Sequence, residues 1–169
     1  EDKDYDALNE YLNNYQKSIP DEHIFFCENS AVNAILSYFS EQARTFGITY
    51  TVSASIPKQI SISETDLSIL FGNLLENAID ACNAQSGEDK KIIVRAKTDN
   101  HSLCVTIDNT FSGSLDINQE GHFVSSKHEG LGLGTESIKS IAEKYGGVCQ
   151  FEANNGMFYA SVMCFKDHV

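Results

Sequence analysis

Residues 63 to 85 read SETDLSILFGNLLENAIDACNAQ, a stretch in which an apolar and a polar pattern both follow helical spacing. Ser63, with Asp66 three residues later, predicts a helix that starts with a capping box. Apolar residues then recur at helical spacing and form one stripe, made up of Leu67, Leu70, Phe71, Leu74 and Ala78. The stretch therefore predicts a long amphipathic helix with a buried apolar side.

A second stripe of the same helix is polar in an unusual way. Asn73, Asn77 and Asp80 follow each other at about one turn, and the whole stretch contains no Lys or Arg. Carboxamide oxygens are hard, neutral ligands, and they suit a Mg²⁺ ion that already carries phosphate oxygens and water. A solvated polar surface is the alternative, and this helix alone leaves both interpretations open.

Composition narrows the class of protein. The chain has 169 residues, 41% of them hydrophobic, which is enough for one substantial core. The net charge of −12 argues against a nucleic-acid partner, because a phosphate backbone needs a basic surface. Five cysteines without CxxC spacing predict core residues in a reducing compartment and argue against zinc. No apolar run approaches the roughly 20 residues of a membrane span, so we expect a soluble, cytoplasmic piece.

The flanking sequence supplies the other elements. Residues 1 to 19 predict an N-terminal helix, which Pro20 ends. Periodicity predicts further helices over 29–47 and 136–145, and strands over 48–56, 92–96, 103–107, 148–153 and 157–165. This order predicts an α+β fold, a two-layer sandwich with helices on one face of a mixed, mostly antiparallel sheet.

Two further stretches carry candidate chemistry. Asp108 and Asn109 stand at the exit of the strand over 103–107, and we expect the Asp108 side chain to lie next to the core. Residues 110 to 130 lack periodicity and predict one long loop, of the kind that is usually functional or disordered. The glycines of GLGLG at 130–134 then open a helix, where backbone N–H groups can approach phosphate oxygens.

Three motifs occur in order: GNLLENAIDA at 72–81, DNTFSG at 108–113 and KHEGLGLG at 127–134. Together they resemble the nucleotide-binding motifs of the gyrase, heat-shock chaperone, histidine kinase and MutL (GHKL) superfamily. The resemblance covers roughly residues 60 to 165 and implies the Bergerat ATP-binding fold. GNLLENAIDA looks like sensor histidine kinases, in particular the peptide-pheromone receptor (AgrC-like) subgroup of quorum sensing.

The resemblance implies a role for each matching residue. Asn77 and Asn73 would hold Mg²⁺, Asp108 would accept a hydrogen bond from the adenine amino group, and Lys127 would meet the terminal phosphates of ATP. The full expected nucleotide-binding set is Asn73, Asn77, Asp80, Asp108, Asn109, Gly113, Phe123, Lys127, Gly130, Leu131, Gly132, Leu133 and Gly134. The run at 108–113 departs from the family pattern Asp-x-Gly-x-Gly, which weakens the assignment of Gly113. Phe123 is equally well explained as a packing residue.

The resemblance also implies a mechanism, in which Asn73, Glu76 and Lys127 are the catalytic candidates. Superfamily members that hydrolyse ATP usually carry a Glu at the position of Asn73, and an amide cannot take a proton at neutral pH. Glu76 projects about 100° around the helix from Asn77, so it is only the second candidate for a base. We therefore expect slow hydrolysis and transfer of the γ-phosphate to a histidine on a dimerisation helix.

The expected organisation follows from the same resemblance. Residues 1–22 would be the end of a dimerisation helix with its linker, and 23–169 the catalytic domain. His128, which precedes Glu129, lies within the glycine motif, so we expect the phosphoacceptor histidine outside this sequence. The implied partners are the protein's own dimerisation region, in a homodimer, and the receiver domain of a response regulator. A membrane would be reached only through N-terminal segments.

Two other functions stay open from sequence. One is a serine kinase of the anti-sigma-factor type, although the helical lead-in over 1–19 speaks against it. The other is a nucleotide-binding scaffold without catalysis, which the irregular run at 108–113 supports best.

Overall fold

The computed structural model describes residues 24–87, 89–112 and 133–165. The elements, in chain order, are α2 (Ser30–Thr45), β1 (Thr49–Ser55), α3 (Glu64–Ala84), β2 (Lys91–Thr98), β3 (Ser102–Thr110), α4 (Leu133–Lys144), β4 (Val148–Asn154) and β5 (Met157–Phe165). The expected helix over 1–19 and most of the expected loop over 110–130 lie outside the described residues, as does the expected domain boundary at 22/23.

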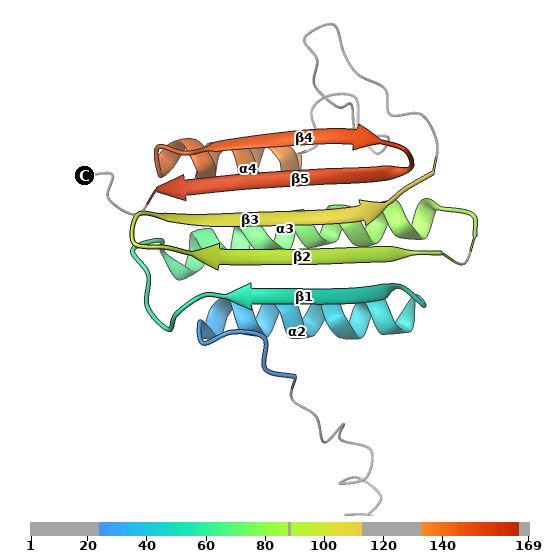
Figure 1. Ribbon diagram of the computed structural model, residues 1–169, viewed down its shortest axis with the longest axis horizontal. Helices are drawn as coiled ribbons and strands as arrows, with labels where there is room; N and C mark the ends of the chain where they lie inside the picture. Colours follow the sequence, from blue (N-terminus) through green and yellow to red (C-terminus); the bar gives the residue numbers. More distant parts are fainter. Residues whose placement is uncertain (1–23, 88, 113–132, 166–169) are drawn as a thin grey trace, which may run out of the picture.

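The described strands form one sheet with the order β1-β2-β3-β5-β4. β1 is parallel to β2, and the other neighbours are antiparallel. The helices α2, α3 and α4 lie behind the sheet, and its other face is open in the view of Figure 1. This arrangement confirms the prediction of an α+β two-layer sandwich.

α3 is the helix around which the core forms. Its first turn is capped as predicted, because the Ser63 side chain accepts a hydrogen bond from the backbone N–H of Asp66 at 3.1 Å. The predicted apolar stripe is buried, and three more apolar side chains of α3 are buried beside it: Leu75, Ile79 and Cys82. α3 packs against the sheet through β3 and has α2 and α4 as neighbours. Each fully buried Leu or Phe stabilises the fold by about 1.5–3 kcal/mol.

The turns follow the chemistry of their residues. The Asn29 side chain caps α2 by accepting a hydrogen bond from Val32 N at 3.0 Å, and Gly47 ends that helix with φ 65°. Asn155 and Gly156 have φ 50° and 75°, which is the left-handed pair that a tight two-residue hairpin turn requires. The predicted helix over 29–47 and the predicted hairpin are therefore confirmed.

α4 begins at Leu133, which is earlier than the predicted start at Glu136. Its apolar periodicity becomes visible only at Ile138, because the first turn contains glycine and polar residues. Gly134 therefore lies inside the first turn of α4. At the other end of the helix, a Cβ at Gly147 would lie 1.8 Å from the carbonyl oxygen of Met163, so only glycine fits between α4 and β5.

Candidate functional site

The polar stripe of α3 faces the start of α4. Asn73 is half-buried and Asn77 is exposed. The Asn73 amide nitrogen donates to the backbone oxygen of Ile69 at 2.9 Å, so the amide oxygen Oδ1 points away from that carbonyl. A Cβ at Gly134 would lie 3.2 Å from Asn73 Oδ1 and 3.6 Å from Asn77 Nδ2. The structure thus brings together two motifs that are far apart in the sequence.

This junction combines two kinds of group that bind phosphate and its counterion. The first turn of a helix presents unpaired backbone N–H groups, and the helix dipole favours an anion there. The amide oxygens of Asn73 and Asn77 are hard ligands that Mg²⁺ accepts. Glycine at 134 leaves the space beside Asn73 Oδ1 without a side chain. The residues present therefore fit an anion with a divalent cation. Among the described residues, no three His, Cys, Asp or Glu side chains gather into an alternative metal site.

Other predicted site residues lie around or beyond this junction. Glu76 is exposed on α3, and Asp80 is half-buried one turn beyond Asn77. Leu133 is the first residue of α4. The remaining predicted residues lie outside the described part of the chain: Gly113, Phe123, Lys127, Gly130, Leu131 and Gly132.

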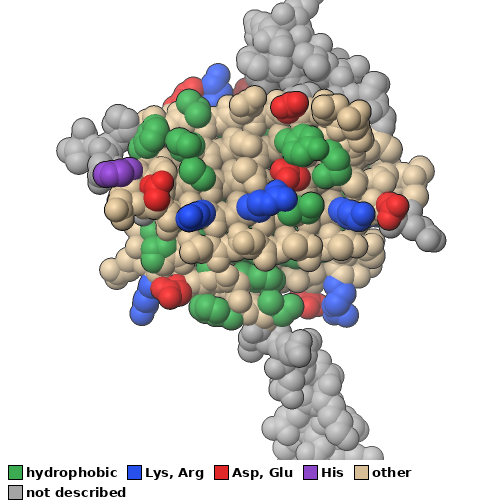
Figure 2. All heavy atoms as spheres, viewed as in Figure 1, with side chains coloured by type: hydrophobic (Ala, Val, Ile, Leu, Met, Phe, Trp, Pro, Cys, Tyr) green, Lys and Arg blue, Asp and Glu red, His purple; other side chains and the backbone are tan. Residues whose placement is uncertain are grey.

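The expectation that the Asp108 side chain lies next to the core is wrong. Asp108 is within β3, and its neighbours Ile107 and Asn109 are the residues that face the helices. Asp108 Oδ2 instead lies 2.6 Å from Nη1 of Arg95, an exposed residue of β2. Figure 2 shows this open face of the sheet, with a row of Lys and Arg side chains and acidic groups beside it. Asp108 thus lies on the opposite face from Asn73 and Asn77.

Asn109, the residue after Asp108, lies on the side of β3 that faces the helices. It is only 2% exposed, and its amide nitrogen donates to the backbone oxygen of Thr110 at 3.0 Å. Cys82 of α3 is close by, because its sulfur lies 3.5 Å from the same Thr110 oxygen. The signal was present in the sequence: Leu103, Val105 and Ile107 alternate inward, and the next inward position is 109.

The cysteines are unpaired thiols, as their spacing predicts. Cys27, Cys82 and Cys164 are buried in the core, while Cys104 and Cys149 are half-buried. Burial raises the pKa of the Cys82 thiol above its ordinary value, so this group stays protonated and packs as a small apolar residue.

An ionic cluster that the sequence did not reveal joins α3 to the end of α4. Oδ2 of Asp66 accepts hydrogen bonds from Ser63 Oγ at 2.6 Å, Lys144 Nζ at 2.7 Å and Tyr145 OH at 2.6 Å. The Lys144 hydrogen bond, followed by those from Ser63 and Tyr145, lowers the pKa of Asp66 to about 2. Tyr145 OH also accepts from Ser63 N at 3.0 Å, which is the bond that the predicted capping box would have given to the Asp66 carboxylate.

No helix in the described ranges has both the length and the apolar character needed to cross a membrane. The expectation that the cysteines are core residues is confirmed for Cys27, Cys82 and Cys164 and not for the half-buried Cys104 and Cys149, and the expectation of a reducing compartment stays a prediction.

Comparison with known proteins adds sequence relatives. The chain is 24% identical over 136 residues to a probable C4-dicarboxylate sensor kinase of Bacillus subtilis (strain 168), covering 76% of this chain and 25% of that protein. It is 36% identical over 84 residues to the C4-dicarboxylate transport sensor protein DctB of Rhizobium meliloti (strain 1021), covering 48% of this chain and 13% of that protein. The chain thus spans a quarter or less of the length of these curated relatives.

Solved structures share the fold. The catalytic domain of histidine kinase ThkA superposes with a TM-score of 0.62 at 20% identity, covering 80% of this chain and 92% of that one. The mycobacterial sensor histidine kinase MprB gives a TM-score of 0.55 at 18% identity, covering 78% and 93%. The model of the GHKL domain matches residues 62–164, which is more than half of the sequence. The chain therefore belongs to the GHKL domain family.

Proposed function

We propose that the chain is the ATP-binding catalytic domain of a two-component sensor histidine kinase, which transfers the γ-phosphate of ATP to a histidine on a dimerisation helix. The observation that carries the proposal is the junction at which Gly134, in the first turn of α4, lies against Asn73 and Asn77 of α3. A helix start beside the side-chain amides of Asn73 and Asn77 suits a triphosphate with its metal ion. The two curated relatives are named as sensor proteins, one of them a kinase.

Asn73 and Asn77 are the residues that would hold Mg²⁺. When bound, Mg²⁺ neutralises charge on the phosphate oxygens. The hydrogen bond from Asn73 to Ile69 O holds one amide in place with its oxygen turned outward. Asn77 is exposed, so its amide is open to a ligand. Backbone N–H groups of the first turn of α4 would hold the phosphates, with Lys127 and the glycines over 130–132 as the expected further contacts.

The adenine ring is the second part of the proposal. Asn109 supports adenine recognition better than Asp108 does, because it lies on the helix-facing side of β3. Its amide oxygen can accept a hydrogen bond from the adenine amino group, and its amide nitrogen can donate to a ring nitrogen. Asp108 is engaged with Arg95 on the open face of the sheet. We therefore move the adenine role predicted for Asp108 to Asn109.

The chain favours phosphate transfer over hydrolysis. The amide of Asn73 is not a base at neutral pH, and Glu76, the other candidate, is exposed on α3. A water molecule at this site would therefore lack a general base to deprotonate it, whereas the imidazole nitrogen of a histidine is itself a nucleophile.

Partners and signal are proposed at a coarser level. A homodimer through the dimerisation region, and a response regulator as the phosphate acceptor, fit a two-component sensor; ThkA, of the same fold, has been solved in complex with response regulator protein TrrA. We propose a cytoplasmic domain of a membrane-anchored protein. The peptide-pheromone subgroup remains a proposal that rests on GNLLENAIDA, and the names of the curated relatives point to C4-dicarboxylates instead.

Transfer of phosphate tests this function. The domain is mixed with ATP labelled on the γ-phosphate and with a separately produced dimerisation segment that carries the acceptor histidine. We expect weak, acid-labile label on the segment and little on the domain, because the two parts are no longer held at high effective concentration. Acid-stable phosphoserine would support the serine-kinase alternative. Nucleotide binding without any transfer would support the scaffold.

A further inference from the structure

The cluster of Ser63, Asp66, Lys144 and Tyr145 stands apart from the nucleotide junction, at the opposite end of α4. One carboxylate oxygen of Asp66 accepts three hydrogen bonds of 2.6 to 2.7 Å, and two of the donors come from the C-terminal end of α4. Asp66 is 8% exposed. The cluster therefore fastens the start of α3 to the end of α4. We name it the Asp66 clamp.

Further contacts fix the same end of α4 to the sheet. The backbone oxygen of Tyr145 accepts a hydrogen bond from Phe165 N of β5 at 2.9 Å, while Gly147 N donates to Ala142 O at 2.8 Å and closes the C-terminal turn of α4 itself. The contact between Gly147 and Met163 leaves no space for a Cβ. The C-terminal end of α4 is thus held from two sides, by α3 and by β5.

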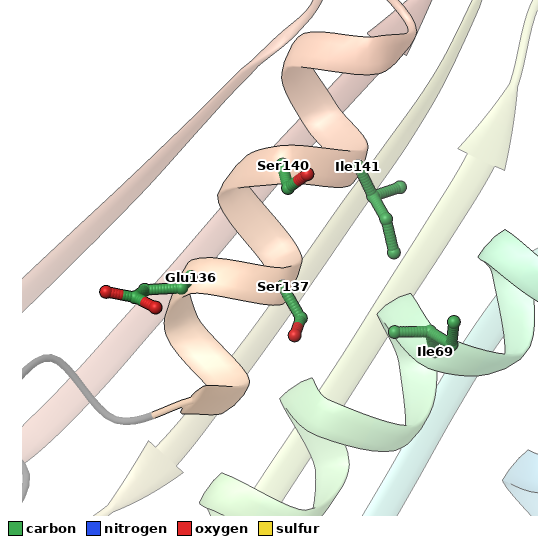
Figure 3. A pocket seen from close by; sticks show the side chains of 5 residues that line it. All are labelled: Ile69, Glu136, Ser137, Ser140 and Ile141. Atoms are coloured by element: carbon green, nitrogen blue, oxygen red, sulfur yellow. The ribbon is translucent and has the colours of Figure 1, made fainter.

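A surface groove lies between the clamp and the nucleotide junction. A groove between α3 and α4 is lined by Ile69, Glu136, Ser137, Ser140 and Ile141. In Figure 3, Ile141 and Ser137 of α4 point toward Ile69 of α3, and small serine side chains make up much of the α4 side. Ile69 is still 40% exposed, so side chains do not fill this groove. Ile138 and Ala142 of α4 are nevertheless fully buried, so the core holds the middle of α4, and the clamp adds a polar contact to α3 at its C-terminal end.

The length of α4 turns this into a lever. From Lys144 to Gly134 the helix spans about 15 Å, so a tilt of about 5° at the clamp would displace Gly134 by roughly 1.3 Å. Gly134 lies beside α3, where a Cβ built on it would be 3.2 Å from Asn73 Oδ1, so a displacement of this size changes the spacing between the first turn of α4 and the Asn73 amide. A shift of about 1 Å in a group that positions a reacting phosphate is costly to catalysis.

We infer that the Asp66 clamp is a positioning device: by fixing the tilt of α4, it holds the phosphate-binding first turn of this helix in register with the amides of Asn73 and Asn77. Asp66, Lys144 and Tyr145 are then positioning residues that touch neither nucleotide nor metal. The inference rests on the proposed function, because it assigns the clamp to the triphosphate half of the same site. The inference therefore predicts that the clamp affects binding of the triphosphate and not binding of adenosine, for which we propose residues of β3.

The test compares two ligands in three variants. Lys144→Met removes the cation, whose side chain is 60% exposed, and leaves Ser63 and Tyr145 on the Asp66 carboxylate. Tyr145→Phe removes the hydroxyl that bonds both Asp66 and Ser63 N. Lys139→Met is the matched control, since Lys139 lies on the same helix and its exposed pair with Glu143 is 3.9 Å long. Dissociation constants for MgATP and for adenosine are measured by NMR titration of each variant.

We expect Lys144→Met and Tyr145→Phe to weaken MgATP binding about fivefold to tenfold, while adenosine affinity stays within about twofold and Lys139→Met changes neither. Lys144→Arg should restore MgATP binding. Equal losses for both ligands, or a lowered melting temperature with the affinity ratio unchanged, would show a purely structural cluster and overturn the inference. If the wild-type domain fails to bind MgATP, the proposed function itself fails. If it binds MgATP and the ratio survives both substitutions, only the clamp inference fails.

Discussion

Replacement of Gly134 by alanine should lower the affinity for MgATP and leave the free energy of unfolding nearly unchanged. Alanine in the first turn of α4 gains helix propensity, at most about 1 kcal/mol. Its Cβ would lie 3.2 Å from Asn73 Oδ1, so the amide must yield by a few tenths of an ångström. That movement strains the 2.9 Å hydrogen bond from Asn73 to Ile69 O, which is worth about 0.5–1.5 kcal/mol. The two contributions nearly cancel, and we expect a free energy of unfolding within about 1 kcal/mol of wild type.

The affinity for MgATP should decrease in Gly134→Ala. The displaced Asn73 oxygen and the added methyl group both disturb the place where phosphate and metal meet, so we expect a loss of about tenfold, or about 1.4 kcal/mol. Urea denaturation gives the stability and isothermal titration calorimetry gives the affinity.

Gly72→Ala provides the matched control on the neighbouring helix. A Cβ at Gly72 of α3 meets no atom within 4 Å, so this variant should gain up to about 1 kcal/mol of stability and keep its MgATP affinity. The reasoning is refuted if Gly134→Ala gains the same stability as Gly72→Ala and still binds MgATP as the wild type does. That result would place the phosphates away from the first turn of α4.

Three further predictions follow from named contacts. Asn77→Ala should remove the magnesium-dependent part of ATP affinity and leave binding in EDTA nearly unchanged; equal losses in both titrations would indicate a damaged α3 instead. Asn109→Ala should weaken ATP binding by about 1–3 kcal/mol, whereas Asp108→Asn should leave it within about twofold; the reverse pattern would return the adenine role to Asp108. Because the folded state holds the pKa of Asp66 at about 2, below its ordinary 3.8, the clamp stabilises the fold fully above about pH 4 and loses this effect as the pH falls toward 2. In urea denaturation, the difference in free energy of unfolding between wild type and Asp66→Asn should therefore narrow by about 1 kcal/mol over that pH range. The change is small because the Lys144 side chain is largely exposed. A difference that stays constant with pH would show that the charge of Asp66 does not stabilise the fold.

Much of the fold is readable from local patterns. The apolar stripe of α3, the Asn29 cap of α2 and the left-handed turn at Asn155-Gly156 each depend on residues close together in the sequence. Helix periodicity, caps and tight turns are local physics, so they survive into the folded structure. The early start of α4 escaped prediction because Gly134 weakens both helix propensity and apolar periodicity in its first turn.

The site is readable only in part. Asn73 and Asn77 stand out because amides replace the charged residues usual on an exposed helix surface, and their meeting with Gly134 depends on tertiary packing. The orientation of Asp108 was predictable from the inward alternation of Leu103, Val105 and Ile107. The prediction failed because it ended the strand at Ile107, whereas β3 continues to Thr110. The capping box revealed Ser63 and Asp66 of the clamp, whereas Lys144 and Tyr145 had no sequence signal, because they lie 78 and 79 residues from Asp66.

The proposed nucleotide site is tested by titration of the domain with ATP, first in magnesium and then in EDTA. The junction of Asn73, Asn77 and Gly134 predicts saturable one-site binding that magnesium strengthens severalfold, and the adenine role proposed for Asn109 predicts weaker binding of GTP. Tight, magnesium-dependent ATP binding would support an active nucleotide site in this GHKL domain. Affinity for ATP that is undetectable at millimolar concentration, or that is identical with and without magnesium, would contradict the account.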